Sequence, residues 1–174
     1  MSFSFVPDYS FRGITDVSAG FLKRLGIRFL MLDLDNTIAA YDEPSPAESV
    51  KQWVAEAKGC GICLFIVSNS VRQERVEAFG EALGVDSATG ARKPSPKGVI
   101  QAMETAGFTA SESALIGDQA YTDMLAANLA GALSIIVRPR RFTNPFLAVR
   151  YALETPFRAM CRNKGAIGFD KVCS

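Results

Sequence analysis

The sequence contains no histidine among its 174 residues. This absence excludes hydrolases built on a Ser-His-Asp triad or a Cys-His pair, and it excludes zinc sites with histidine ligands. No apolar run approaches the roughly 18 residues of a membrane-spanning helix. No basic segment precedes an apolar one at the N-terminus, so a cleaved signal is not expected. We therefore expect a cytoplasmic chain.

Cysteine is also scarce, with four residues in the chain. Cys60 and Cys63 have the CxxC spacing, but they precede an expected strand, whereas redox pairs of this kind follow a strand and open a helix. Cys161 and Cys173 are too far apart to form a second CxxC pair for zinc. The cysteines are expected to be ordinary reduced thiols.

The chain has little net charge, but its basic and acidic residues are unevenly distributed along the sequence. The formal net charge is +1, yet residues 138–174 contain eight basic and two acidic residues, and residues 1–137 contain 11 basic and 16 acidic residues. Such an asymmetry predicts a basic tail that meets an anionic surface. No nucleic acid partner is expected. With 48% hydrophobic residues, the chain is long and apolar enough for one domain with a core.

Apolar runs alternate with helical segments that end at glycine, the residue preferred just after a helix. The expected strands cover about 27–34, 62–67, 85–89, 114–116 and 133–137. The expected helices cover about 16–25, 45–59, 71–83, 93–107 and 121–130, the second of them opened by Ser45 as N-cap and Pro46 at the first helical position. Strands and helices that alternate with short connections predict an α/β fold with a Rossmann-like, doubly wound parallel sheet.

Polar residues stand where several of the expected strands end. They are Asp33 and Asp35 after the first strand, Ser68 and Asn69 after the second, Lys93 before a helix, and Asp118 and Asp123 after a later strand. The carboxyl ends of parallel strands meet at one edge of a sheet, where ligands bind. Two carboxylates two residues apart repel each other unless a cation or a proton lies between them. Hard oxygen ligands suit Mg²⁺, so this edge is predicted to hold Mg²⁺ and a phosphoryl group.

Other sites are built from similar residues. A calcium-binding EF-hand loop starting at Asp33 would need Gly and Glu where Ile38 and Pro44 stand. A glycosyltransferase-type DxD motif would leave Lys93 and Asp118 unexplained. A response-regulator receiver uses acids, a hydroxyl and a lysine, but in a different order along the chain.

The polar residues also resemble the motifs of a known family. Four segments are similar, in the right order, to the motifs of the haloacid dehalogenase-like (HAD) phosphatase superfamily: Asp33-Leu34-Asp35-Asn36-Thr37, the strand end at Ser68, Lys93, and Gly117-Asp118-Gln119-Ala120-Tyr121-Thr122-Asp123. The resemblance implies that Asp33 is the nucleophile that forms a phosphoaspartate and that Asp35 is the acid and base. It further implies that Mg²⁺ is held by Asp33, the main-chain carbonyl of Asp35 and Asp118, with support from Asp123. Ser68, Asn69 and Lys93 are the candidates for binding phosphate.

A finer resemblance is to the YqeG-like branch of subfamily IIIA. It rests on an early Pro-Asp-Tyr, the short loop after Asp35, Arg92-Lys93-Pro94 and Gly117-Asp118-Gln119. Mitochondrial relatives of that branch dephosphorylate phosphatidylglycerophosphate, which makes this phospholipid the first expectation for the substrate. A soluble phosphate, a phosphoprotein, or a non-catalytic interaction protein on the same fold remain the alternatives.

The domain layout follows from the spacing of the motifs. A catalytic core is expected over residues 27–137, with an N-terminal arm and short helix over 1–26 and a basic, aromatic, helical tail of the same domain over 138–174. Neither the 33 positions between Asp35 and Ser68 nor the 25 between Ser68 and Lys93 can hold a folded cap domain. The basic and aromatic residues of the tail are typical of a lipid headgroup interface, so peripheral membrane contact is expected; a helix that covers the sheet, with solvated arginines, is the alternative.

Overall fold

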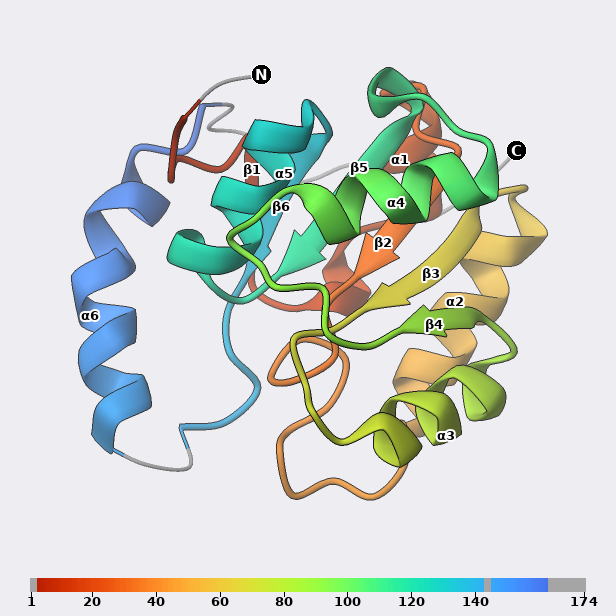
Figure 1. The fold of residues 1–174 in the computed structure, drawn as a ribbon, viewed down its shortest axis with the longest axis horizontal. Helices are drawn as coiled ribbons and strands as arrows, with labels where there is room; N and C mark the ends of the chain where they lie inside the picture. The colour runs from red at the N-terminus through yellow and green to blue at the C-terminus, as the bar shows by residue number, and fades with distance from the viewer. Residues whose placement is uncertain (1–2, 143–144, 163–174) are drawn as a thin grey trace.

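The computed structural model describes residues 3–142 and 145–162. Its six strands form one parallel sheet in the order β1-β6-β5-β2-β3-β4 (Figure 1). The strands are β1 (Tyr9–Phe11), β2 (Phe29–Leu32), β3 (Cys63–Val67), β4 (Asp86–Ala88), β5 (Ser113–Gly117) and β6 (Leu133–Val137). The helices are α1 (Ala19–Arg24), α2 (Glu48–Gly59), α3 (Gln73–Leu83), α4 (Lys97–Ala106), α5 (Leu125–Ala130) and α6 (Pro145–Ala159), with shorter turns at η1 (Ile14–Asp16), η2 (Ala110–Glu112) and η3 (Ala120–Met124).

The central strand β2 is apolar throughout because both faces of the sheet are covered. Leu30 and Leu32 belong to a core shared with α1, α2 and α3. Phe29 and Met31 point the other way, into a second core shared with α4 and α5. Alternate side chains of a strand face opposite sides of a sheet, so the unbroken apolar run builds two cores. The expectation of a doubly wound parallel sheet is confirmed.

Within residues 3–142 and 145–162, no cap domain covers the sheet. A loop over residues 36–47 and helix α2 occupy the chain between Asp35 and β3, while α3 and β4 occupy most of the chain between Ser68 and Lys93. The carboxyl edge of the sheet is therefore not enclosed by an inserted domain, as the motif spacing predicts.

Three local expectations are wrong in detail. Helix α2 begins at Glu48 with Ala47 at its N-cap, so Ser45 does not cap it, and Pro46 is buried ahead of the helix. The expected helix over 121–130 is divided into the wider turn η3 and the short α5. Within the N-terminal arm, Tyr9–Phe11 adds an edge strand that pairs with β6.

Helix α6 lies on the flank of the molecule beside η3 (Figure 1). Phe157 of α6 and Phe5 of the N-terminal arm pack together, with ring centroids 5.3 Å apart, against a small core of Ala120, Met124 and Ile136. Within residues 3–142 and 145–162, no helix is both long and apolar enough to cross a bilayer.

The cysteine expectation needs one correction. Cys63 is a free thiol, but Cys60 takes part in a disulfide bond. The expectation of reduced thiols is therefore wrong for Cys60, because the CxxC spacing does not reveal which cysteines pair.

Candidate active site

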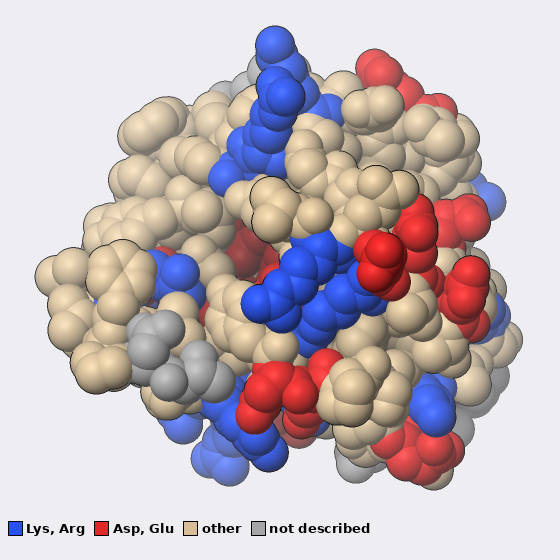
Figure 2. Space-filling view, turned by 60° about the horizontal axis from the view of Figure 1, so that its bottom comes forward, with Lys and Arg blue, Asp and Glu red and all other residues tan. Residues whose placement is uncertain are grey.

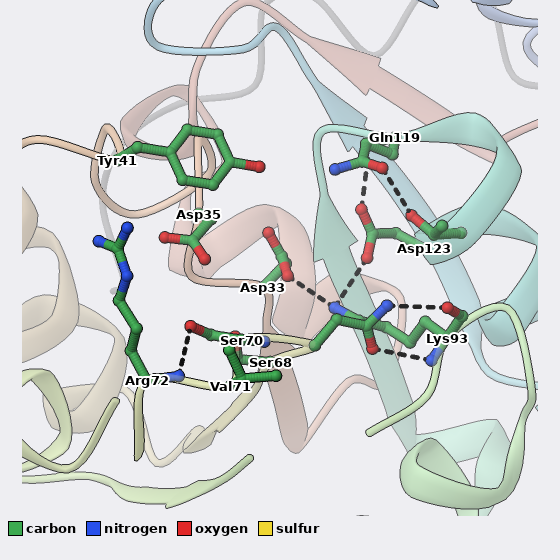
Figure 3. Close-up of a pocket in the computed structure, with 12 residues that line it drawn as sticks. Asp33, Asp35, Tyr41, Ser68, Ser70, Val71, Arg72, Lys93, Gln119 and Asp123 are labelled. Atoms are coloured by element: carbon green, nitrogen blue, oxygen red, sulfur yellow. Dashed lines mark hydrogen bonds and ion pairs between the residues drawn. The ribbon is translucent and has the colours of Figure 1, made fainter. Parts of the chain in front are cut away.

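The predicted site residues meet at the carboxyl edge of three adjacent strands. Asp33 follows β2, Ser68 follows β3 and Asp118 follows β5, and β2 lies between the other two. All of the predicted site residues except Asp118 line a pocket of about 300 Å³ (Figure 3). The lining residues are Asp33, Asp35, Tyr41, Ser68, Asn69, Ser70, Val71, Arg72, Lys93, Gln119, Thr122 and Asp123. In the space-filling view, acidic atoms lie deep in a hollow that has basic side chains on either side (Figure 2).

Lys93 joins two of the acids. Its Nζ lies 2.7 Å from Oδ1 of Asp33 and 2.8 Å from Oδ1 of Asp123, and it donates a hydrogen bond to the carbonyl of Val67 at 2.8 Å. Burial opposes the charge of this lysine, but the Asp123 and Asp33 carboxylates raise its pKa well above the ordinary value. Lys93 therefore carries a positive charge at the bottom of the pocket.

Asp33 is buried next to these charges. Burial raises the pKa of its carboxyl group to about 7, against the opposing effect of Lys93. The Thr37 hydroxyl donates a hydrogen bond to Asp33 Oδ2 at 3.2 Å. The carboxylate is held between Thr37 on one oxygen and Lys93 on the other.

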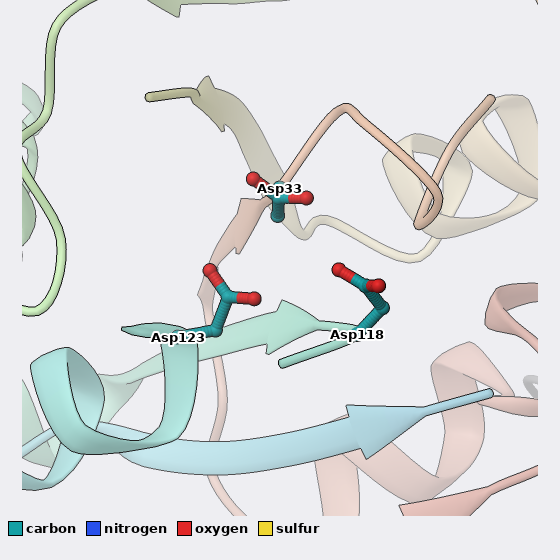
Figure 4. Close-up of side chains that lie close together, drawn as sticks. All are labelled: Asp33, Asp118 and Asp123. Atoms are coloured by element: carbon teal, nitrogen blue, oxygen red, sulfur yellow. The ribbon is translucent and has the colours of Figure 1, made fainter. Parts of the chain in front are cut away.

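Three carboxylates form a tight cluster. Asp33, Asp118 and Asp123 each place an oxygen within 4.8 Å of the other two (Figure 4). Burial, together with the charges of Asp33 and Asp123, raises the pKa of Asp118 well above its ordinary value. Both oxygens of Asp118 are buried without a hydrogen-bond partner. A buried carboxylate without a hydrogen-bond partner is costly, so this cluster has the donor set and the unsatisfied oxygens that suit a hard divalent cation such as Mg²⁺.

Asp35 does not join the cluster. Its carboxylate lies nearer the mouth of the pocket (Figure 3) and is 3.3 Å from Nη1 of Arg75. Burial raises the pKa of Asp35, while Arg75 and Arg72 oppose the rise. A carboxyl group whose pKa is raised can keep a proton for donation. The predicted metal contact of Asp35 is through its main-chain carbonyl and remains a prediction.

The phosphate-binding candidates differ in their surroundings. Ser68 is buried, and its Oγ accepts a hydrogen bond from the backbone N–H of Ser70 at 3.0 Å. Asn69 lines the pocket, but its side-chain amide is bonded to the backbone of Lys93 through both Nδ2 and Oδ1. Asn69 therefore positions Lys93, and direct contact of Asn69 with phosphate stays a prediction.

Asp123 reaches the cluster because Gly117 leaves room for it. A Cβ atom on Gly117 would lie 2.3 Å from Cγ of Asp123, a distance that no side chain tolerates. Asp123 Oδ2 also accepts a hydrogen bond from the backbone N–H of Gln119 at 3.1 Å. The close approach of strand end and turn explains why glycine stands before Asp118.

Helix α6 contributes residues that the sequence interpretation missed. Arg158 donates hydrogen bonds to the main-chain carbonyls of Asp118 and, at 3.0 Å, Val137. Nη2 of Arg150 lies 3.8 Å from Oδ2 of Asp118, and the buried Glu154 lies within 4.0 Å of both arginines. The spacing Arg150, Glu154, Arg158 marks one helix face and is the signal that could have revealed this contact.

The tail arginines near the last strand do not all face outward. Arg140 Nη2 lies 3.2 Å from Oε1 of Glu43, and Arg141 Nη1 lies 3.0 Å from Oδ2 of Asp42. These two acids belong to the loop after Asp35, so part of the charge asymmetry is balanced within the chain.

Comparison with known proteins agrees with this arrangement. The sequence profile of the haloacid dehalogenase-like hydrolases matches residues 9–131. The chain belongs to this family. It is also 30% identical over 168 residues, 96% of this chain and 97% of the relative, to a Bacillus subtilis (strain 168) protein named "Probable phosphatase YqeG". The chain is thus a hydrolase of the HAD phosphatase type.

Solved structures share the fold at low sequence identity. An uncharacterised protein from Listeria monocytogenes serotype 4b has a TM-score of 0.54 and 15% identity, covering 68% of this chain and 85% of that one. The cobalt-bound deoxy-D-mannose-octulosonate 8-phosphate phosphatase from Haemophilus influenzae has a TM-score of 0.52 and 16% identity, covering 79% and 92%. The corresponding enzyme from Moraxella catarrhalis, in complex with magnesium, phosphate and KDO, has a TM-score of 0.51 and 14% identity, covering 79% and 91%.

Proposed function

We propose that this HAD-family hydrolase is a Mg²⁺-dependent phosphomonoesterase that works through a phosphoaspartate on Asp33. The observation that carries the proposal is the cluster of Asp33, Asp118 and Asp123, in which both oxygens of Asp118 are buried without a hydrogen-bond partner. Lys93 stands beside the same carboxylates. The site therefore combines carboxylates that can bind a metal cation with an ammonium group that can bind a phosphate anion.

The residues of the cluster fit Mg²⁺ because they offer only oxygen ligands. Asp33 and Asp118 would hold the ion, with Asp123 in support and the main-chain carbonyl of Asp35 as a further ligand. When bound, Mg²⁺ would neutralise the carboxylates, keep Asp33 ionised and bind a phosphate oxygen.

The first chemical step forms the covalent intermediate. A carboxylate oxygen of Asp33 attacks phosphorus, and the bond between phosphorus and the ester oxygen breaks. Asp35 donates its proton to the leaving alkoxide, a role that suits a carboxyl group whose pKa is raised by burial. Ser68 and Lys93 bind the phosphoryl oxygens during the transfer.

The second step restores the enzyme. Asp35, now ionised, removes a proton from a water molecule that attacks phosphorus of the phosphoaspartate. The bond between phosphorus and the Asp33 oxygen breaks, and inorganic phosphate leaves. Arg75, 3.3 Å from Asp35, fixes the orientation of Asp35 in both steps.

The open site favours a phosphate carried by a large molecule. Val71 at the pocket rim is 96% exposed, and no cap domain closes over Asp33 in the part of the chain that the structure describes. An uncapped pocket does not by itself enclose a small substrate. The resemblance to the YqeG-like branch of subfamily IIIA, whose mitochondrial relatives dephosphorylate phosphatidylglycerophosphate, favours a phospholipid phosphate, with phosphatidylglycerophosphate first among the candidates.

The deciding experiment measures turnover of a generic aryl phosphate by the purified chain, with Mg²⁺ and with a chelator. We expect turnover only with Mg²⁺; no turnover under any divalent cation would contradict the proposal. A parallel panel of phosphatidylglycerophosphate, soluble sugar phosphates and a phosphoprotein then identifies the substrate class. A strong preference for a soluble sugar phosphate would contradict the phospholipid assignment while leaving the phosphatase assignment in place.

A further inference from the structure

Helix α6 has its charged face turned toward the protein. Its three charged side chains, Arg150, Glu154 and Arg158, are 20%, 1% and 9% exposed. They meet the main chain at Asp118 and Val137 and one another. A helix on the surface of a protein normally buries its apolar face and exposes its charges. Helix α6 departs from this pattern because it turns its charged side chains inward together with Leu147 and Phe157.

The outer face of α6 carries no charge. All nine exposed positions of the helix hold uncharged residues, and the only hydroxyl among them, on Thr155, already donates to the carbonyl of Tyr151 at 3.0 Å. Phe146, Val149 and Leu153 are 72%, 58% and 61% exposed. In Figure 2 the lobe that contains α6 shows mostly uncharged atoms on its outside. A contiguous exposed apolar surface of this kind marks an interaction site.

Neighbouring residues extend this surface at both ends. Phe142, half-exposed, packs its ring against Tyr151 of α6 with centroids 5.2 Å apart. Phe3, largely exposed, packs against Phe5, which in turn contacts Phe157 of α6. The apolar residues therefore come from the helix, the segment before it and the N-terminal arm.

We propose that this uncharged outer face of α6 docks on a lipid bilayer and so presents the catalytic edge to a phosphate carried by the membrane. The inference rests on the proposed phosphatase function and names the surface that would bring such a substrate to it. It differs from contact through basic residues, because Arg140 and Arg141 are paired with Glu43 and Asp42, and Arg150 and Arg158 point inward.

A bilayer suits this face better than a protein partner. Protein interfaces carry about one hydrogen bond per 100–200 Å² and a polar rim, whereas the exposed positions of α6 offer no free polar side chain. A bilayer surface needs only apolar side chains to insert and basic groups at the border. Exposed Arg138 lies four positions before Phe142 in the chain and supplies a basic group for that border.

The orientation links the surface to the chemistry. Arg158 binds the main-chain carbonyl of Asp118, and Arg150 lies beside the Asp118 carboxylate. The same helix therefore contacts the acidic cluster with its inner face and exposes its apolar residues with the other. A membrane bound to the outer face would be separated from the acidic cluster by the helix, which is about 10 Å across.

The test is co-sedimentation of the full chain with phosphatidylcholine vesicles, with and without phosphatidylglycerol, at about 0.1 M and about 1 M NaCl. We expect binding to both vesicle types that persists at the higher salt concentration. Val149→Glu/Leu153→Glu and, separately, Ala152→Glu should lower the fraction bound at least about tenfold, because a charge would enter the apolar layer. The matched control is Ala55→Glu at an exposed position of α2, which should leave binding unchanged.

Three results would overturn the proposal. One is the absence of vesicle binding by the unaltered chain. Another is binding to anionic vesicles only, removed by about 1 M NaCl and insensitive to Ala152→Glu. The third is a dimer, measured by light scattering, that Ala152→Glu dissociates, since a second copy would then cover the face. Turnover of a soluble aryl phosphate should be equal in all these variants, so a failure of docking is distinguishable from a failure of the proposed catalysis.

Discussion

Asn69 holds the backbone of Lys93 at two atoms: its Nδ2 donates to the Lys93 carbonyl and its Oδ1 accepts from the Lys93 N–H, both at 2.8 Å. These two hydrogen bonds join the end of β3 to the segment around Lys93, whose ammonium group lies beside Asp33 and Asp123. Asn69, a candidate for binding phosphate, therefore positions the backbone of another candidate, Lys93.

Replacing Asn69 with alanine tests this positioning role. Asn69→Ala should destabilise the protein by about 1–3 kcal/mol, since the Lys93 backbone loses two partners, and it should lower kcat more than it raises KM. Asn69→Asp retains the acceptor and should lose less stability. Chemical denaturation and steady-state kinetics give the two readouts. Unchanged stability with a raised KM alone would favour direct phosphate contact by Asn69.

Asp33→Asn should abolish turnover while the fold is retained. The change removes the attacking oxygen charge and one metal ligand at almost constant volume, so activity should fall at least about 10³-fold. Circular dichroism and a thermal melt check the fold. Near-normal activity in Asp33→Asn would show that the phosphoaspartate mechanism is wrong.

Asp35→Asn should also be nearly inactive, but for a different reason. The variant keeps the nucleophile and loses the group that activates water in the second step, so a phosphoenzyme should accumulate. Acid quench of the variant with a ³²P-labelled substrate would detect it. Rapid release of inorganic phosphate by Asp35→Asn would count against the assigned role of Asp35.

The stability of the metal-free protein should depend on Asp33 in a defined pH window. Burial raises the pKa of Asp33 from 3.8 to about 7, so the folded state binds more protons than the unfolded state between these values. The stabilising effect of the protonated group is complete below the lower value and is lost as pH rises toward the upper one. We therefore compare the Tm of the unaltered chain with that of Asp33→Asn, both measured in a chelator. The Tm of the unaltered chain minus that of the variant should fall between pH 4 and pH 7.

Mg²⁺ should reverse this trend. Metal binding needs ionised carboxylates and competes with protons, so added Mg²⁺ should raise Tm more at pH 8 than at pH 5. Equal effects at both pH values would argue against binding at the cluster of Asp33, Asp118 and Asp123.

Gly117→Ala should disturb the acidic cluster from outside it. The new methyl group would meet Asp123 at 2.3 Å, and relief of that clash should cost about 1–3 kcal/mol of stability and weaken Mg²⁺ binding in calorimetry. Gly59→Ala is the matched control, because a Cβ there meets nothing within 4 Å. Normal Mg²⁺ affinity in Gly117→Ala would show that Asp123 does not support the metal site.

The sequence by itself determined the sheet and the place of the chemistry. The apolar run Phe29–Leu32 demands cover on both faces, and glycine after the helices ends each of them, as Gly84 and Gly107 do in left-handed conformations. Because the carboxyl ends of parallel strands meet, residues as distant in sequence as Asp33 and Asp118 could be predicted to lie together. These are consequences of local pattern and of the rules of parallel sheets.

Only the tertiary structure decided which partner each charge has. Arg140 could be recognised as basic from the sequence, but its pairing with Glu43, 97 positions away, depends on how two loops lie in space. The alternation in α6 predicts a helix with one polar and one apolar face, and a polar face normally turns to water. In this protein it turns inward, because the carbonyls of Asp118 and Val137 receive Arg158, and Phe146, Val149 and Leu153 are left outside.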